Sequence, residues 1–166
     1  MRSSRAWVVW GISVLAYLSA VTQRTTFGVA GLEATERFGA TASILSVFTV
    51  VQLLVYAGLQ IPVGVLVDRF GPRLLIAGGA ALMVAGQFQL ATAESVGGGI
   101  LGRSLVGAGD ALTFISVLRL LPAWFSGRHI PVLTQWTGIV GQLGQIVSAV
   151  PFAFVLHKYG WNTAFV

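Results

Sequence analysis

Two ionisable residues, Arg103 and Asp110, interrupt an otherwise uncharged stretch at residues 95–118. If that stretch is a helix, their seven-residue spacing places both on one face. They then lie about 10 Å apart along the axis, which is too far for a direct ion pair. A charge at the centre of a membrane helix costs about 2.5 to 3.5 kcal/mol. We therefore predict that each residue faces either a watery interior or a partner on another helix.

This setting predicts a role for both residues in ion coupling or gating. A carboxylic acid near the middle of a membrane is held out of bulk water, which suits it to taking up and releasing a proton. Asp110 is therefore the candidate proton carrier. The alternative is a structural ionic network, in which Arg103 and Asp110 only fix the packing of helices.

A third charge, Arg24, follows the eighteen uncharged residues 6–23. Two interpretations stay open. A helix of that length nearly crosses the hydrocarbon core, so Arg24 can extend to the outer headgroups. The uncharged residues 25–32 that follow indicate instead a longer helix that keeps Arg24 within the membrane, where its guanidinium fork suits a carboxylate or a phosphate.

The composition of the chain requires a membrane around these charges. Of the 166 residues, 55% are hydrophobic and only 9% are charged, whereas a water-facing surface needs about 25 to 35% charged residues. Cysteine is absent and the two histidines lie far apart in sequence, so we predict no metal site, no catalytic residues and no cofactor. The net charge of +5 comes from scattered arginines that form no basic face, so we expect no nucleic acid partner.

Five segments are long and apolar enough to cross a bilayer, which takes about 20 residues. The predicted helices cover residues 6–31, 43–67, 74–93, 96–120 and 130–156. The connections between them are short, so consecutive helices should be antiparallel neighbours. The sequence therefore predicts an all-α polytopic membrane protein.

Basic residues in the connections predict the orientation, because they concentrate on the cytoplasmic side. A cytoplasmic N-terminus leaves only Arg37 and Lys158 outside. It places six arginines inside: Arg2, Arg5, Arg69, Arg73, Arg119 and Arg128. We predict an integral protein of the cytoplasmic membrane with its N-terminus in the cytoplasm.

The connection between the second and third predicted helices has its own motif, GVLVDRFGPR, at residues 64–73. Asp68 can complement a helix end, Gly71 and the following proline favour a tight turn, and the arginines hold the loop in the cytoplasm. The alternative is an ordinary basic turn.

This motif resembles the loop between helices two and three of the major facilitator superfamily. Residues 103–109, RSLVGAG, are similar to the RxxxGxG of that family's fourth helix. The run from Gly138 to Pro151 resembles its glycine-rich fifth helix, although the usual Gly-Pro adjacency is absent, and Gly160-Trp161 resembles the turn before its sixth. The resemblance implies residues 1–166 are an incomplete amino-terminal half-domain, with five helices of a six-helix half in a twelve-helix transporter. We expect a fragment that ends before the sixth helix.

The resemblance also implies roles for individual residues. The loop would act as a cytoplasmic gate between the two halves, and its carboxy-terminal partner half is expected to be missing from this chain. The gating residues are Gly64, Asp68, Arg69, Gly71 and Arg73. Arg24 resembles the first-helix arginine of organic-anion and phosphate-ester transporters of the superfamily, where an arginine binds the substrate anion.

The family's cavity is lined by helices one, two, four and five, which implies a second tier of binding candidates. These polar side chains on apolar helices are Tyr17, Gln52, Tyr56, Gln135 and Gln142. Hydrogen bonding between helices is the alternative role for each of them.

The resulting prediction is a secondary active transporter that moves a small solute by alternating access, coupled to an ion such as the proton. The solute is an anion if Arg24 binds it. Residues 107–110 also match the GxGD of intramembrane aspartic proteases, but that chemistry needs two carboxylates and no second one lies in a predicted span, so no enzyme is expected. The competing prediction is a non-transporting membrane scaffold or an inactive truncated half-transporter.

Overall fold

The computed structural model describes residues 2–165, with all side chains in that range except those of residues 2, 3 and 147. Within this range every regular element is a helix. In chain order they are α1 (Arg2–Val29), α2 (Gly31–Phe38), α3 (Ala42–Phe70), α4 (Pro72–Thr92), α5 (Val96–Trp124), the 3-10 turn η1 (Gly127–His129), α6 (Ile130–Val147), the π-helical segment η2 (Ser148–Phe152), α7 (Ala153–Tyr159) and α8 (Trp161–Phe165).

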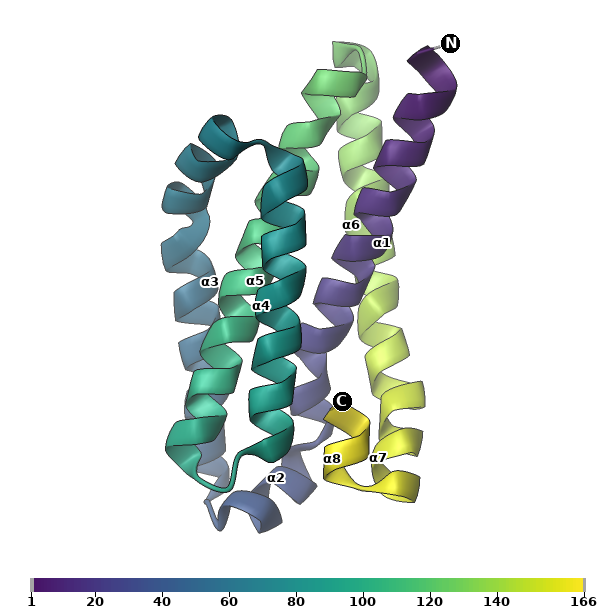
Figure 1. The fold of residues 1–166 in the computed structure, drawn as a ribbon. Coiled ribbons are helices and arrows are strands. Elements are labelled where there is room, and N and C mark those ends of the chain that lie inside the picture. Colours follow the sequence, from purple (N-terminus) through teal and green to yellow (C-terminus); the bar gives the residue numbers. More distant parts are fainter. Residues whose placement is uncertain (1, 166) are drawn as a thin grey trace.

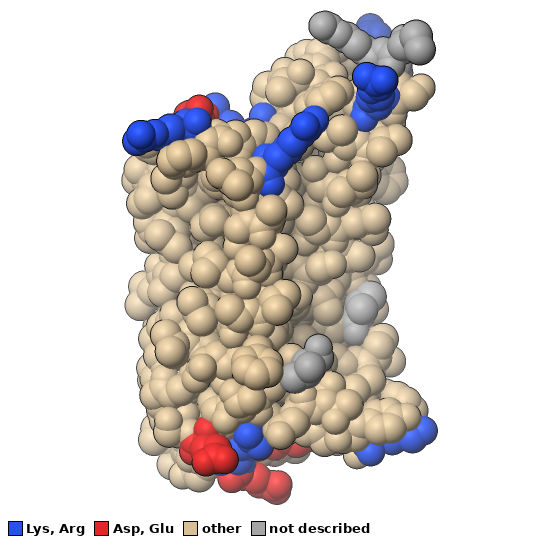
Figure 2. Space-filling view, in the orientation of Figure 1, with Lys and Arg blue, Asp and Glu red and all other residues tan. Residues whose placement is uncertain are grey.

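Five helical stretches are long and apolar enough to span a bilayer, namely Ser4–Val29, Ala42–Phe70, Pro72–Thr92, Val96–Trp124 and Gly127–Tyr159. They run side by side along one direction, with α2, α7 and α8 gathered at the end opposite the N-terminus (Figure 1). Charged side chains collect at the two ends of the visible face, and the broad band between them is uncharged (Figure 2). This distribution matches a bilayer that surrounds the uncharged middle of the bundle. The predicted all-α fold with five membrane spans is confirmed.

The boundaries differ from the predicted ones at several places. Helices α3 and α5 run on to Phe70 and Trp124, past the predicted 67 and 120, and the last predicted helix, 130–156, is interrupted by η2. The first helix was predicted to reach residue 31 but ends at Val29, and the predicted connection after it contains the helix α2. The α2 helix is amphipathic, turns Ala34 and Phe38 into the core and ends at Gly39, whose φ of 55° favours glycine. This helix is short and contains charged Glu and Arg residues, so a search for long apolar segments does not detect it.

The closest helix packing lies between α4 and α5, which approach each other through glycines. A Cβ on Gly79 would lie 2.7 Å from the carbonyl oxygen of Gly109, and one on Gly86 would lie 2.8 Å from that of Gly102. Small residues at such crossings let two backbones come together in a membrane, where dispersion contacts drive association. This packing fixes the depth and rotation of the α5 face that carries Arg103 and Asp110.

An aromatic cluster closes the end of the bundle that carries α2 and α8. The ring of Phe48 lies 4.9 Å from that of Phe27 and 5.3 Å from that of Phe38. Arg37 donates hydrogen bonds of 3.0 Å to the carbonyl oxygens of Ala91 and Ala93 at the end of α4, which helix ends otherwise leave unsatisfied. These contacts tie α2 and α4 together at one membrane surface.

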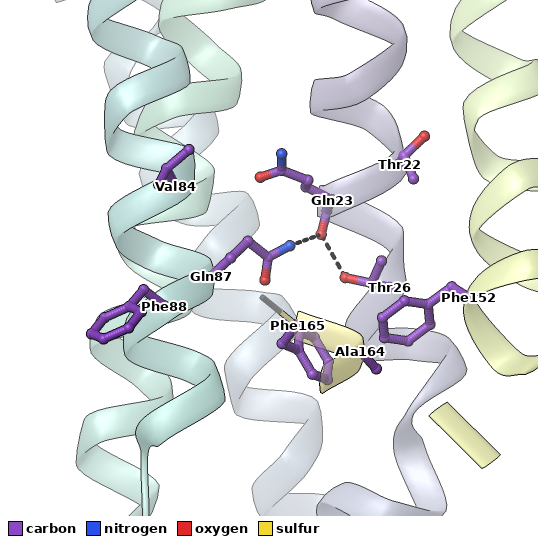
Figure 3. Close-up of a pocket in the computed structure, with 9 residues that line it drawn as sticks. All are labelled: Thr22, Gln23, Thr26, Val84, Gln87, Phe88, Phe152, Ala164 and Phe165. Carbon is purple, nitrogen blue, oxygen red and sulfur yellow. Dashed lines mark hydrogen bonds between the residues drawn. The ribbon is translucent and has the colours of Figure 1, made fainter. Parts of the chain in front are cut away.

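The bundle is open between α1 and α4. A cavity of about 300 Å³ lies between these helices, bounded at its lower end by α8 (Figure 3). We call it the α1–α4 cleft.

Two adjacent glycines of α4 test the packing against α5. Gly79→Ala should lower the free energy of unfolding by about 1 to 3 kcal/mol, because its Cβ would overlap backbone atoms. The control is Gly78→Ala, whose Cβ would meet only Leu112 Cδ2, at an ordinary 3.8 Å. Thermal unfolding of the two detergent-purified variants measures their stabilities. Equal losses of stability would contradict the proposed role of the α4–α5 contact.

Candidate functional site

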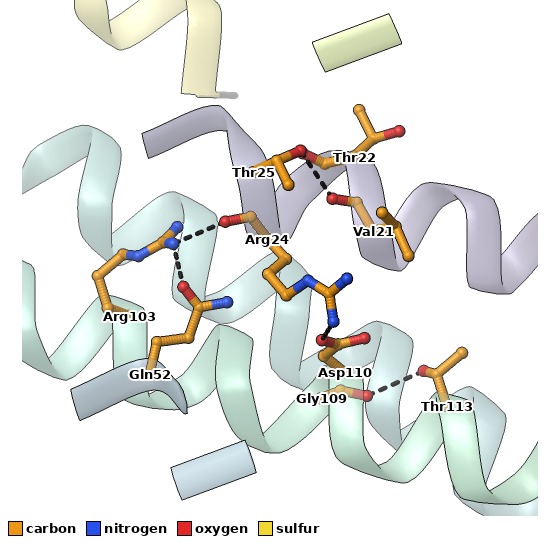
Figure 4. Close-up of polar contacts among 9 residues, drawn as sticks. All are labelled: Val21, Thr22, Arg24, Thr25, Gln52, Arg103, Gly109, Asp110 and Thr113. Atoms are coloured by element: carbon orange, nitrogen blue, oxygen red, sulfur yellow. Dashed lines mark hydrogen bonds and ion pairs between the residues drawn. The ribbon is translucent and has the colours of Figure 1, made fainter. Parts of the chain in front are cut away.

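Helices α1, α3 and α5 bring four polar side chains together inside the bundle: Arg24, Gln52, Arg103 and Asp110 (Figure 4). The seven-residue spacing of the two α5 charges aims both at α1 and α3, as two turns of helix require. They do not pair with each other, and each meets a partner on another helix. This is one of the two arrangements predicted for them.

Asp110 forms an ion pair with Arg24 across the α1–α5 contact. Arg24 Nη1 lies 3.0 Å from Asp110 Oδ2, and the Asp110 side chain is fully buried whereas that of Arg24 is 22% exposed. The interpretation that Arg24 extends to the outer headgroups is therefore wrong for this structure, because its guanidinium turns inward to a carboxylate. The partnership itself was not predicted.

Arg103 is as fully buried as Asp110, but it has no carboxylate partner among the residues described. Its Nη2 donates to the backbone oxygen of Arg24 at 2.7 Å and to Gln52 Oε1, and its Cζ lies 5.0 Å from the ring centre of Phe27. Its Nε and Nη1 atoms have no hydrogen-bond partner in the described chain. Arg103 therefore retains unused donors and an unbalanced positive charge.

A cavity of about 260 Å³ adjoins this group and is lined by both arginines, Gln52 and residues of α1 and α3. The second carboxylate oxygen of the ion pair, Asp110 Oδ1, accepts no hydrogen bond within residues 2–165. The site thus combines two guanidinium groups, one carboxylate, several unsatisfied polar atoms and an adjoining space.

The second-tier candidates divide into two sets. Tyr56 lies beside the ion pair, with its ring centre 5.9 Å from Arg24 Cζ, and the ring of Phe114 connects it to Tyr17. Gln135 and Gln142 lie on α6, where both side chains are exposed. Phe27 and Phe114 were not predicted to belong to the site. The candidates were chosen as polar residues within apolar helices, and phenylalanine does not meet that criterion.

The predicted gating loop lies at the end of the bundle that carries the N-terminus, but most of it is helical (Figure 1). Of its predicted residues, Gly64, Asp68 and Arg69 belong to α3 and Arg73 to α4, and Gly71 alone lies between the two helices. Gly71 has a φ of 81°, which explains the glycine, whereas a Cβ on Gly64 would meet nothing within 4 Å. Asp68 pairs with Arg119 of α5 at 2.7 Å, both being more than half exposed.

The two loop arginines lie differently. Arg69 Cζ lies 5.3 Å from the ring of Phe70, and Arg73 lines a space next to α1. Exposed ion pairs contribute at most about 1 kcal/mol, so the pair of Asp68 with Arg119 can open at little cost.

Known transporters are similar to the chain along nearly its whole length. It is 29% identical over 157 residues to the inner membrane transport protein YajR of Escherichia coli, an alignment that covers 95% of this chain and 33% of YajR. It is 25% identical over 163 residues to the methyl viologen resistance protein SmvA of Salmonella typhimurium, with 98% and 33% covered. The probable L-galactonate transporter of Escherichia coli is 25% identical over 154 residues, with 93% and 33% covered.

The chain spans about a third of the length of these relatives. The sequence profile described as the Major Facilitator Superfamily matches residues 13–166, which include the α5 charges and the loop between α3 and α4. The five spans agree with one half of that fold. The chain therefore belongs to the Major Facilitator Superfamily.

Proposed function

We propose that this chain forms the amino-terminal part of a secondary transporter that carries a small anionic solute together with a proton by alternating access. The single observation that carries the proposal is the charge balance of the buried site. The group contains two guanidinium groups, Arg24 and Arg103, but one carboxylate, Asp110, which pairs with Arg24, so the group has an excess of one positive charge. The remaining helices and the second half of the solute path would follow in the rest of the transporter.

An excess positive charge favours an anionic solute for a physical reason. A buried charge without a counter-charge costs several kcal/mol, which a bound carboxylate or phosphate would offset. The Nε and Nη1 atoms of Arg103 carry N–H donors without a partner among the described residues, and each can donate to an oxygen of such an anion. The relatives' names mention compounds as different as methyl viologen and L-galactonate, so the names do not select a class of solute and the proposal of an anion rests on the charge balance.

The ion pair supplies a route for coupling. When Arg24 turns to bind an anion, Asp110 loses its partner in a desolvated place, where a carboxyl group is more stable neutral than charged. Asp110 would then take up a proton as the solute binds and release it when Arg24 returns. Solute and proton would thus move in the same direction.

Two further features support a solute path completed by other helices. Gln135 and Gln142 are exposed on α6 although they lie within a span, and an amide in contact with lipid has no hydrogen-bond partner there. We assign this face of α6 to the wall of the path. The weak, exposed pair of Asp68 with Arg119, next to Arg69 and Arg73, suits a gate that opens and closes in each cycle.

The orientation is testable because residues 1–166 contain no cysteine. With the N-terminus in the cytoplasm, Glu94→Cys between α4 and α5 lies outside and Gly127→Cys between α5 and α6 lies inside. A membrane-impermeant maleimide should label the first in intact cells and the second only after permeabilisation. The reverse labelling pattern would show that the N-terminus lies outside and would contradict the proposed orientation.

Proton coupling predicts a specific defect in Asp110→Asn, tested in the full-length transporter reconstituted in liposomes. An amide cannot carry a proton, so accumulation of solute driven by a proton gradient should be lost, while exchange of labelled for unlabelled solute persists. Glu36→Gln on the exposed side of α2 is the control and should retain both activities. Accumulation by Asp110→Asn that still depends on the gradient would remove Asp110 from coupling.

Anion binding predicts that Arg24→Lys weakens affinity although it keeps the charge. Loss of the bidentate fork, worth about 1.4 kcal/mol, should raise the KM for an anion about tenfold. The probe is L-galactonate, compared with its uncharged counterpart L-galactose, and the exposed Arg128→Lys is the control. The anion proposal fails if the transporter carries neither L-galactonate nor any other anion. It also fails if Arg24→Lys leaves the KM for an anion unchanged.

A further inference from the structure

The short helix α2 separates two environments at the end of the bundle opposite the N-terminus (Figure 1). On one side, Gly31, Leu32 and Thr35 line a cavity of about 430 Å³ whose other walls come from α1 and α3. Glu33 lies more than half a turn of helix from Gly31. It pairs with His157 of α7, with 3.1 Å between Glu33 Oε1 and His157 Nδ1. One face of α2 therefore borders a cavity, and another is held by α7.

The cavity beside α2 leads towards the buried charged group. Gly28 and Thr49 line both this cavity and the one that adjoins Arg24 and Arg103. A Cβ on Gly28 would meet nothing within 4 Å, so α1 leaves the passage between the two spaces open at this position. The position of α2 therefore decides how wide the space is at the end farther from the arginines.

Two contacts fix the position of α2 from the side that does not face the cavity. In the first, Arg37 donates to two carbonyl oxygens at the end of α4, and its Cζ lies 5.6 Å from the ring centre of Trp161. Arginine keeps its charge at any physiological pH, so this contact is permanent. The second contact is the pair of Glu33 with His157, and histidine is the side chain whose charge ordinarily changes between pH 5 and 8. Only the second contact responds to pH.

The imidazole of His157 has one acidic partner among the described residues, Glu33. The elements η2 and α8, which pack against α7, contain no titratable residue. On α7 itself, the ammonium group of Lys158 lies 5.4 Å from the ring centre of Phe154 and 5.3 Å from that of Tyr159. Two further acidic residues at this end of the bundle form no ion pair with the imidazole, namely Glu36 and Glu94. The strength of the contact between α2 and α7 therefore depends on the charges of the pair itself.

The sign of this dependence follows from the charges. In acidic medium that leaves Glu33 ionised, a protonated His157 forms a full ion pair with it, and the neutral imidazole at higher pH can offer only a hydrogen bond. The two side chains are 70% and 27% exposed, and a pair exposed to this extent changes an equilibrium by at most about fivefold. The contact is strongest below the pH at which His157 loses its proton and weakens as the pH rises through that range.

We propose that α2 is a pH-sensitive lid at the outer end of the solute path, and that protonated His157 holds it open through Glu33. Since Glu33 lies on a side of α2 that does not face the cavity, the ion pair holds α2 back from α3, and its loss at higher pH lets α2 move towards α3 and narrow the cavity. The proposal rests on the proposed function in taking this cavity as part of the solute path and α2 as external.

The test measures access to Thr49, which lines both cavities and is exposed. Thr49→Cys reacts with 2-sulfonatoethyl methanethiosulfonate at about pH 5.5 and about pH 8.5, on either side of the histidine range. The protein is the detergent-purified full-length transporter with Asp110→Asn and with any cysteine beyond residue 166 replaced by serine. The rate with His157 is divided by the rate with His157→Gln, so that the ionisation of the thiol cancels. The ratio should be about two to five in acid and should fall to unity at the higher pH.

Matched variants separate the lid from other effects of pH. His157→Arg, which is always charged, should keep the fast rate at both pH values, and Glu33→Gln should remove the difference between His157 and His157→Gln. Glu94→Cys, which lies outside the cavity, is the control cysteine and should react equally with either residue at position 157. A ratio for Thr49→Cys that does not change with pH, or one that persists in Glu33→Gln, would overturn the proposal. The measurement needs neither transport nor Asp110, so its failure and the failure of the proposed function are distinguishable.

Discussion

The ion pair between Arg24 and Asp110 is the interaction around which the described bundle is organised. An uncompensated charge inside a membrane helix costs several kcal/mol, so α1 and α5 must keep the register that joins the two groups. The glycine contacts of α5 with α4 hold that register from the opposite side, because they leave little freedom for α5 to slide or rotate. Arg103 adds a second constraint through its hydrogen bond to the Arg24 backbone.

Helix α1 connects this charged face to a neutral one. On its other side Thr22 donates to the carbonyl oxygen of Gly144, and Thr25 shares a hydrogen bond of 2.6 Å with Ser148, where α6 gives way to the π-helical segment. Pro151 lies in that segment, and proline cannot donate the backbone hydrogen bond of a regular helix. These hydrogen bonds connect α1 to α6, so a movement of the Arg24 backbone would displace α6 as well. The proposed coupling thus has a physical connection between the ion pair and the face of α6 that we assign to the solute path.

Membership of the Major Facilitator Superfamily and the charge balance of the site answer different questions. The family assignment covers residues 13–166 and accounts for the half-fold and for the loop motif. It does not specify the solute, since one similar relative is named for resistance to methyl viologen and another for the transport of L-galactonate. The proposal of an anionic solute rests instead on the excess positive charge of the buried group, which belongs to this chain.

The sequence by itself determined the fold class, because an apolar segment of about 20 residues can satisfy its backbone in a bilayer only as a helix. It also determined that Arg103 and Asp110 share a face of α5, since that follows from helix geometry alone. Only the tertiary structure decided that Asp110 pairs with Arg24 and that Arg103 has no carboxylate, because these contacts depend on how separate helices rotate against each other. It likewise revealed α2, whose stability comes from packing Phe38 into the aromatic cluster, a long-range contact that no local pattern encodes.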